Sequence, residues 1–188
     1  MPDIPILRAG RTLLRPFSTA DAPDVLNLLS DAEVTAFLPM FPLHSLAEAQ
    51  SFLRNENRRL WAVCPQGTDA PAGYICVGRE EPFDLGYALQ RRFRGCGVIT
   101  GASKAALGYL KAEGVPYVTA THDVNNPRSG AVMRRLGMDY CYSYREQWQP
   151  KDISVVFRLY QIPLADANAK TYMGYWERYP EHFIEPGL

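Results

Sequence analysis

The chain has 188 residues, 47% of them apolar, and its 20 basic residues balance 20 acidic ones, so its formal net charge is zero. This length suits one well-packed domain, and the neutral balance argues against overall attraction to nucleic acid or to an anionic membrane. The four cysteines are dispersed, without a Cys-x-x-Cys pair or a histidine cluster, so no metal site is expected.

The first half of the chain alternates strand-like and helix-like patterns. We expect a strand over residues 11–17, helices over 18–31, 31–38 and 45–60, and strands over 60–64, 72–78 and 83–89. Ser45 and Glu48 form a capping box, and the apolar stripe of that helix continues to Leu60. The three strands are typical of an antiparallel meander. The apolar loop over residues 40–44 is either ordinary packing or a contact for a substrate.

The second half continues the alternation. We expect a helix over about 95–113, a strand over 116–123, a helix over 125–138, strands over 139–148 and 153–162, and a last helix over 169–179. Gly114 and Pro116 end the first of these helices, and Asn126 with Pro127 opens the second. The last helix carries four aromatic side chains, which we expect to anchor it to the domain: Tyr172, Tyr175, Trp176 and Tyr179.

Residues 84–110, with the sequence DLGYALQRRFRGCGVITGASKAALGYL, predict a phosphate-binding site. An apolar strand leads into a basic turn with two glycines and then into a helix. Unpaired N–H groups and the helix dipole favour an anion at such a helix start. Gly95 and Gly97 let the backbone approach a phosphate without a Cβ in the way. Arg91, Arg92 or Arg94 could meet a further phosphate group.

Two motifs give the chain a family resemblance. One is LGYALQRRFRGCGVITGA over residues 85–102, and the other is NNPRSGAVMRRLGM over residues 125–138. In this order and at this distance they resemble the GNAT superfamily of acyl-CoA-dependent N-acetyltransferases, in particular the ribosomal-protein N-terminal (RimJ/RimL-like) branch. The resemblance implies an α+β (mixed α/β) fold with a mostly antiparallel sheet, a splayed parallel strand pair, and helices on both faces. The acetyltransferase domain would span residues 1–163, with residues 164–188 as a helical tail packed on it.

The resemblance also implies acetyl-CoA as the co-substrate, held between the two splayed strands. The pyrophosphate would lie on the glycine loop, whose signature starts either at Arg94 or, in a second register, at Arg92. Ile99 departs from the small residue that is usual in the first register. The cofactor-binding residues implied are Tyr87, Ala88, Leu89, Arg94, Gly95, Cys96, Gly97, Val98, Ile99, Thr100, Asn126 and Ser129.

Acyl transfer from a thioester needs a neutral amine, stabilisation of a developing oxyanion, and a proton for the departing thiolate. Asp84 is the candidate base, because relatives often carry an acidic residue before the Gly-Tyr pair. Asn126 and Ser129 match the family's Asn-x-x-Ser, and Ser129 could pass a proton to the sulfur. Asn126 could also be a helix cap alone. Met133 stands where many relatives carry a tyrosine acid, and His122 is expected to be structural.

The expected reaction is therefore acetyl transfer from acetyl-CoA to a primary amine, either a protein N-terminus or a small molecule. Two alternatives stay open: a non-catalytic CoA-binding module and, with less support, a dinucleotide-binding domain. Neither a leader pattern nor an apolar run of ~18 residues is visible, which favours a reducing cytoplasm. We expect no nucleic-acid or membrane partner, and the oligomeric state is open, with a homodimer as one option.

Overall fold

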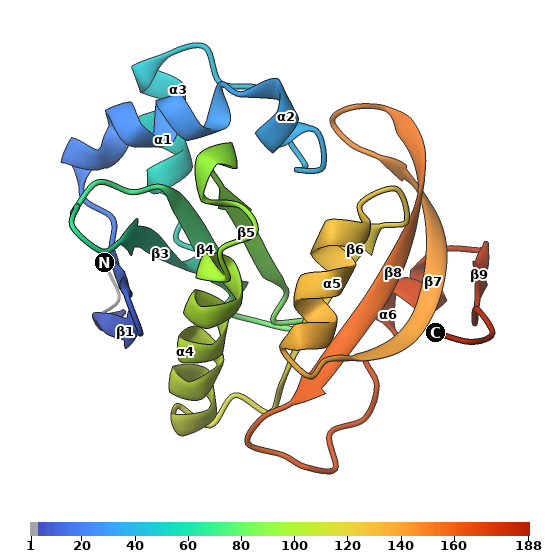
Figure 1. Cartoon of the computed structure of the whole chain (residues 1–188). Helices are drawn as coiled ribbons and strands as arrows, with labels where there is room; N and C mark the ends of the chain where they lie inside the picture. The colour runs from blue at the N-terminus through green and yellow to red at the C-terminus, as the bar shows by residue number, and fades with distance from the viewer. Residues whose placement is uncertain (1–3) are drawn as a thin grey trace.

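The computed structural model describes residues 4–188 as two antiparallel sheets that meet along one seam (Figure 1). The first sheet has, in spatial order, the strands β1 (Leu7–Ala9), β2 (Thr12–Pro16), β3 (Arg58–Pro65), β4 (Gly73–Gly78) and β5 (Leu85–Leu89). The second has β6 (Tyr117–Asp123), β8 (Ile153–Pro163), β7 (Asp139–Trp148) and β9 (His182–Phe183). Both sheets are antiparallel within themselves.

The seam lies between β5 and β6, which run in the same direction. Within residues 4–188 they pair at a single parallel bridge, between Asp84 and Thr119. Beyond that bridge β5 pairs only with β4 and β6 pairs only with β8, so β5 and β6 form no further backbone pairing with each other. The expected splayed parallel pair is therefore confirmed, and it forms a wedge that opens toward Leu89 and Asp123.

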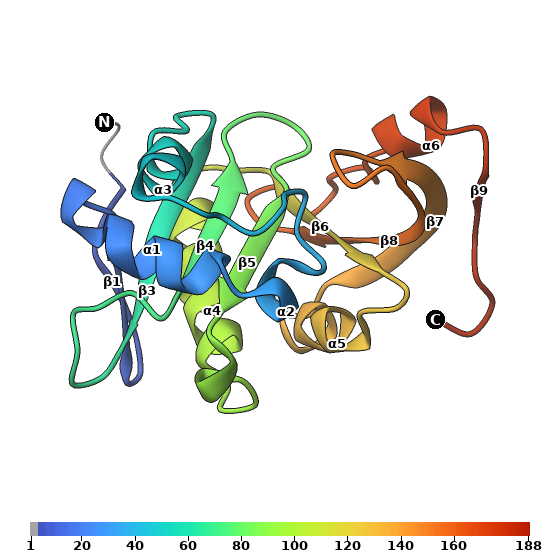
Figure 2. The same ribbon diagram turned by 90° about the horizontal axis from the view of Figure 1, so that it is seen from above.

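Helices cover both faces of the sheets. Figure 2 shows α3 and α6 on one side of the strands and α4 and α5 on the other. The helical segments are η1 (Thr19–Asp21), α1 (Ala22–Leu29), α2 (Ala32–Thr35), α3 (Leu46–Leu53), η2 (Arg91–Phe93), α4 (Val98–Ala112), α5 (Pro127–Arg135) and α6 (Gly174–Arg178). No helix within residues 4–188 combines the length and the apolar content that crossing a bilayer would need.

One buried core joins the two sheets beneath α4 and α5. Leu85 of β5 and Val118 of β6 belong to the same apolar cluster as Ala106 of α4 and Met133 of α5. A separate cluster lies under α1 and α3, around Leu29 and Ala49. The continuous core holds the two strands together at the base of the wedge, while their far ends stay apart.

Three expected elements have different bounds in the structure. The first strand has an additional partner, β1, which the sequence analysis missed because it is only three residues long. The helix that opens at Ser45 ends at Leu53, because Asn55 accepts a hydrogen bond from the Asn57 N–H in a local turn. Leu60 lies on β3, paired with Cys76. The last helix spans only Gly174–Arg178, because the Lys170 carbonyl and the Tyr172 N–H bind the side chain of Gln161 instead of helical partners.

Candidate functional site

The glycine loop places unpaired N–H groups at the open end of β5. Gly95 and Gly97 have φ values of +80° and +74°, in the left-handed region that favours glycine. Helix α4 begins directly after Gly97, whose N-cap position carries no side-chain capping bond from within residues 4–188. The first-turn N–H groups of Val98, Ile99 and Thr100 are therefore free to bind an anion.

The side chains beside the glycine loop differ in how available they are to a ligand. Ile99 is buried in the core beneath α4, so its bulk points away from the exposed loop. Arg91 pairs with Asp31 (3.0 Å) and Glu33 (2.8 Å), and these carboxylates compete with a ligand for its guanidinium. Arg94 is partly exposed beside the loop and forms no ion pair within the described chain. Arg92 donates to the Gln90 Oε1 at 3.1 Å and lies over the Phe93 ring, so Arg94 has the fewest competing side-chain contacts among the three arginines of the turn.

The second helix start, at α5, faces the same wedge. The Asn126 Oδ1 accepts from the Ser129 N–H at 3.3 Å, so this side chain caps the helix. The Ser129 hydroxyl lies 2.8 Å from the hydroxyl of Tyr87, which also donates to the Ser129 carbonyl at 3.1 Å. Burial raises the pKa of Tyr87 to about 12. A hydrogen-bonded pair of hydroxyls thus joins β5 to α5.

Asp84 lies at the point where the strands separate. Its Oδ1 accepts a hydrogen bond from the Thr119 hydroxyl at 3.4 Å, and that hydroxyl also donates to the Pro82 carbonyl at 2.9 Å. The carboxyl is partly buried, and desolvation raises its pKa from 3.8 to about 7. A carboxyl with this pKa can exchange a proton near neutral pH.

Three further side chains near the wedge are not available for the reaction. His122 is 3% exposed beneath α5, with its Nδ1 2.8 Å from the Asp123 carbonyl and its Nε2 against Gly130. Met133 is buried in the core and offers no acid. The Tyr140 hydroxyl contacts Ser143 and accepts from the Glu185 N–H, so it is occupied. The sequence analysis missed the contact of Tyr87 with Ser129, because the two residues are 42 positions apart.

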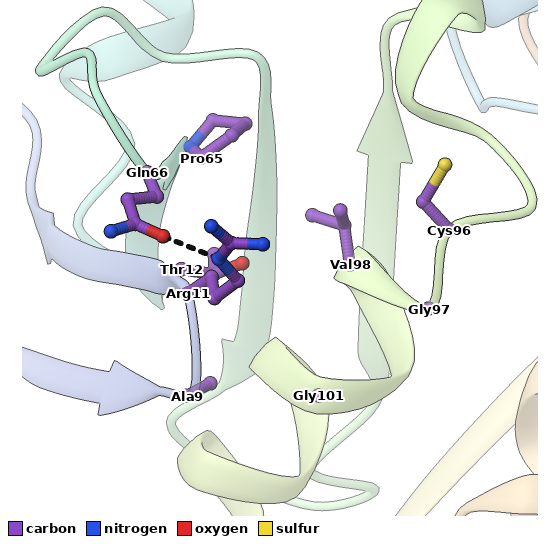
Figure 3. Close-up of a pocket in the computed structure, with 9 residues that line it drawn as sticks. All are labelled: Ala9, Arg11, Thr12, Pro65, Gln66, Cys96, Gly97, Val98 and Gly101. Carbon is purple, nitrogen blue, oxygen red and sulfur yellow. Dashed lines mark hydrogen bonds between the residues drawn. The ribbon is translucent and has the colours of Figure 1, made fainter.

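A pocket of about 540 Å³ lies on the other side of the α4 start (Figure 3). It separates the glycine loop from β1 and β2, and Val98 points across it toward Arg11. The Arg11 Nε donates to the Gln66 Oε1 at 2.5 Å. The residues that line it are Ala9, Arg11, Thr12, Pro65, Gln66, Cys96, Gly97, Val98 and Gly101. Since α4 stands between this pocket and α5, it is distinct from the wedge (Figure 1).

Solved structures with the same fold are numerous, whereas no curated protein matches the chain by sequence. A GNAT acetyltransferase from Bacillus anthracis superposes with a TM-score of 0.78 at 20% identity, covering 86% of this chain and 100% of its own. RimL, a ribosomal L7/L12 α-N-protein acetyltransferase in complex with CoA, gives 0.77 at 17% identity, covering 86% and 99%. The microcin C7 self-immunity acetyltransferase MccE, in complex with acetyl-CoA and AMP, gives 0.72 at 17%, covering 82% and 93%.

The family model for the acetyltransferase (GNAT) domain matches residues 11–139. This range contains the seam, the glycine loop, and both helix starts that face the wedge. The model covers more than half of the chain, and the neighbours above share its fold. The chain therefore belongs to the GNAT acetyltransferase family and is an acyltransferase.

Proposed function

We propose that the protein transfers the acetyl group of acetyl-CoA to a primary amine by direct attack of the amine on the thioester. The observation that best supports this is the single bridge between Asp84 and Thr119, beyond which β5 has a free edge. Two helix starts and one titratable carboxyl meet around that opening. This arrangement supplies a place for a phosphate-bearing thioester and a base beside it.

The glycine loop would hold the pyrophosphate. Backbone N–H groups after Gly97 are charge-assisted donors to phosphate, each worth roughly 1.5–3 kcal/mol. Arg94 adds a positive charge on the exposed side. The free edge of β5, at Tyr87, Ala88 and Leu89, would pair with the amide groups of the pantetheine arm. The same backbone N–H groups are the natural donors to the oxyanion as the carbonyl is attacked.

Asp84 would be the general base. The neutral amine attacks the thioester carbon, and Asp84 takes the proton that the nitrogen loses as the new N–C bond forms and the C–S bond breaks. The Ser129 hydroxyl would pass a proton to the departing thiolate and take one from Tyr87, hydrogen-bonded to it. Tyr87 would then regain a proton from water, and Asp84 would release its own to water. Asn126 would hold Ser129 in place by capping α5.

A protein N-terminus is one acceptor that this site suits. An α-amine has a pKa near 7.7–8.0, so on the order of one in ten is neutral at pH 7, whereas lysine near 10.4 needs a stronger base. A carboxyl with a pKa of about 7 is a strong enough base to assist an α-amine. RimL modifies such an amine, which supports this acceptor class by analogy of fold. A small-molecule amine is the second acceptor class.

The test is turnover of acetyl-CoA with a panel of amines, measured as free thiol and as a mass gain of one acetyl group on the acceptor. The panel contains peptides with a free N-terminus, the same peptides blocked at the N-terminus but carrying lysine, and simple alkylamines. Acetylation of the free N-termini or of the alkylamines is expected. Stabilisation by acetyl-CoA without turnover of any amine would favour the non-catalytic module. Stabilisation by NAD alone would favour the dinucleotide-binding domain.

A further inference from the structure

The segment after β8 returns to the sheet and is fixed there by its backbone. The Gln161 Oε1 accepts from the Tyr172 N–H at 2.8 Å, and its Nε2 donates to the Lys170 carbonyl at 2.9 Å. The Tyr142 hydroxyl donates to the Tyr172 carbonyl at 2.8 Å. These bonds fix the backbone on the sheet just before α6.

This segment lies on the same face of the sheet as Asp84. Gln161 pairs directly with Thr119 of β6, and side chains at paired positions point to the same face. The Thr119 hydroxyl is in turn the hydrogen-bond donor to Asp84. The Tyr172 backbone is therefore bonded to Gln161, which neighbours Thr119, and Thr119 contacts the proposed base Asp84.

Two tyrosine rings lie at and just after this anchored segment. Tyr175 of α6 stacks on Tyr144 of β7 with centroids 4.9 Å apart, and Tyr172 meets Tyr175 edge-on at 5.3 Å. Tyr172 and Tyr175 are both partly exposed, so their rings are not fully covered by the sheet. Burial first, and then the nearby charge of Asp84, raises the pKa of Tyr175. The titratable groups around Asp84 are Cys76, Tyr87, Tyr144, Tyr172 and Tyr175.

We propose that Tyr172 and Tyr175 form the acceptor wall of the active site, where the incoming amine binds as an ammonium ion beside Asp84, over the ring faces that Tyr144 leaves uncovered. The inference rests on the proposed function and adds the residues that bind the acceptor. Amines of this class arrive mostly protonated near neutral pH. A cation within about 6 Å of an aromatic face is attracted to it. The ammonium gives one proton to the Asp84 carboxylate, and Asp84 passes that proton to water, so that the carboxylate is free to take the second proton when the neutral amine attacks.

A merely structural role for the tail makes different predictions. If Tyr175 only anchors α6, any apolar side chain of similar size should replace it without effect on the acceptor. If its ring binds the cation, Tyr175→Phe should keep acceptor binding, whereas Tyr175→Leu should lose it. Met173→Ala, at an exposed neighbouring position of the same segment, is the matched control.

Steady-state kinetics with the best amine of the panel give the first readout. We expect Tyr175→Leu to raise the acceptor KM about fivefold to thirtyfold, with the Kd of acetyl-CoA unchanged and with Tyr175→Phe and Met173→Ala near the wild type. An acceptor KM that Tyr175→Leu leaves unchanged would overturn the proposal.

A second readout needs no acceptor. The carboxyl pKa of Asp84 can be followed by ¹³C NMR, with Asp84→Asn identifying its signal. If the Tyr175 ring lies beside Asp84, as proposed, Tyr175→Ala admits water to the carboxyl, so we expect the Asp84 pKa to fall toward 3.8, while Met173→Ala leaves it in place. An Asp84 pKa that is the same in Tyr175→Ala and the wild type would refute the proposal that Tyr175 lies beside Asp84 in the acceptor wall. A wild-type enzyme that acetylates no amine would instead count against the proposed function.

Discussion

Asp84→Asn tests two properties of the proposed base separately: its effect on the free energy of unfolding and its effect on the catalytic rate. The substitution keeps the shape of the side chain and an oxygen that can accept from Thr119, but it removes the charge. The folded carboxyl has a pKa of about 7, against 3.8 without the fold. The stability that this carboxyl contributes is therefore fully present below about pH 3.8 and is lost as the pH rises through 7.

The size of the effect follows from these two pKa values. One pKa unit corresponds to about 1.4 kcal/mol, so the full difference is on the order of 4 kcal/mol. Asp84 is only partly buried, and water that reaches it reduces the cost, so we expect about 2 kcal/mol. The asparagine variant should gain that much over the wild type between pH 4 and pH 8, or roughly 4–8 °C in Tm.

The assay is urea unfolding of both proteins at several pH values, together with kcat/KM for the best amine. Loss of a general base lowers the rate about 10²–10⁴-fold. We therefore expect a variant that is more stable at pH 8 and nearly inactive. A stability difference that does not change with pH would refute the burial argument, and full activity would refute the catalytic role.

Two further predictions concern the contacts that hold α5 at the wedge. Tyr87→Phe and Ser129→Ala should each lower kcat, and because their hydroxyls are 2.8 Å apart the double variant should lose less than the product of the two effects; independent effects in this double-mutant cycle would contradict the relay. Gly130→Ala would place a Cβ 2.6 Å from the His122 Nε2 and should cost about 1–3 kcal/mol in urea unfolding, whereas Gly108→Ala, with open space around its Cβ, should be neutral or stabilising by up to about 1 kcal/mol. Equal effects at both glycines would show that the contact with His122 relaxes without cost.

The parts of the site that lie close together in the chain were predictable. The order of strand, basic turn and helix follows from local chemistry, because glycines adopt positive φ and an Asn-Pro pair begins a helix. The strand over residues 139–148 is confirmed with the same bounds, since its apolar and polar residues alternate. Such features need no knowledge of distant contacts.

The contacts between distant segments were not predictable. The ion pairs of Arg91 with Asp31 and Glu33 join residues about sixty positions apart, and nothing local to the turn indicates that this arginine is occupied. Desolvation raises the pKa of Asp84, and the side chain that contacts it, Thr119, follows 35 positions later in the chain. The tail was expected to anchor itself through its aromatic residues, and they do pack on Tyr142 and Tyr144. Its approach to Asp84 became visible only with the fold.

The central claim is that the glycine loop and the wedge bind acetyl-CoA, and thermal unfolding with this ligand tests it most directly. At 100 times its Kd, acetyl-CoA should stabilise the wild type by about 2.7 kcal/mol, or roughly 5–11 °C. Gly97→Trp should abolish that shift. Gly114→Trp is the matched control, because Gly114 also has a positive φ and open space, at the other end of α4. The account predicts a shift in the wild type and in Gly114→Trp but none in Gly97→Trp; no shift in the wild type, or an equal shift in all three proteins, would contradict it.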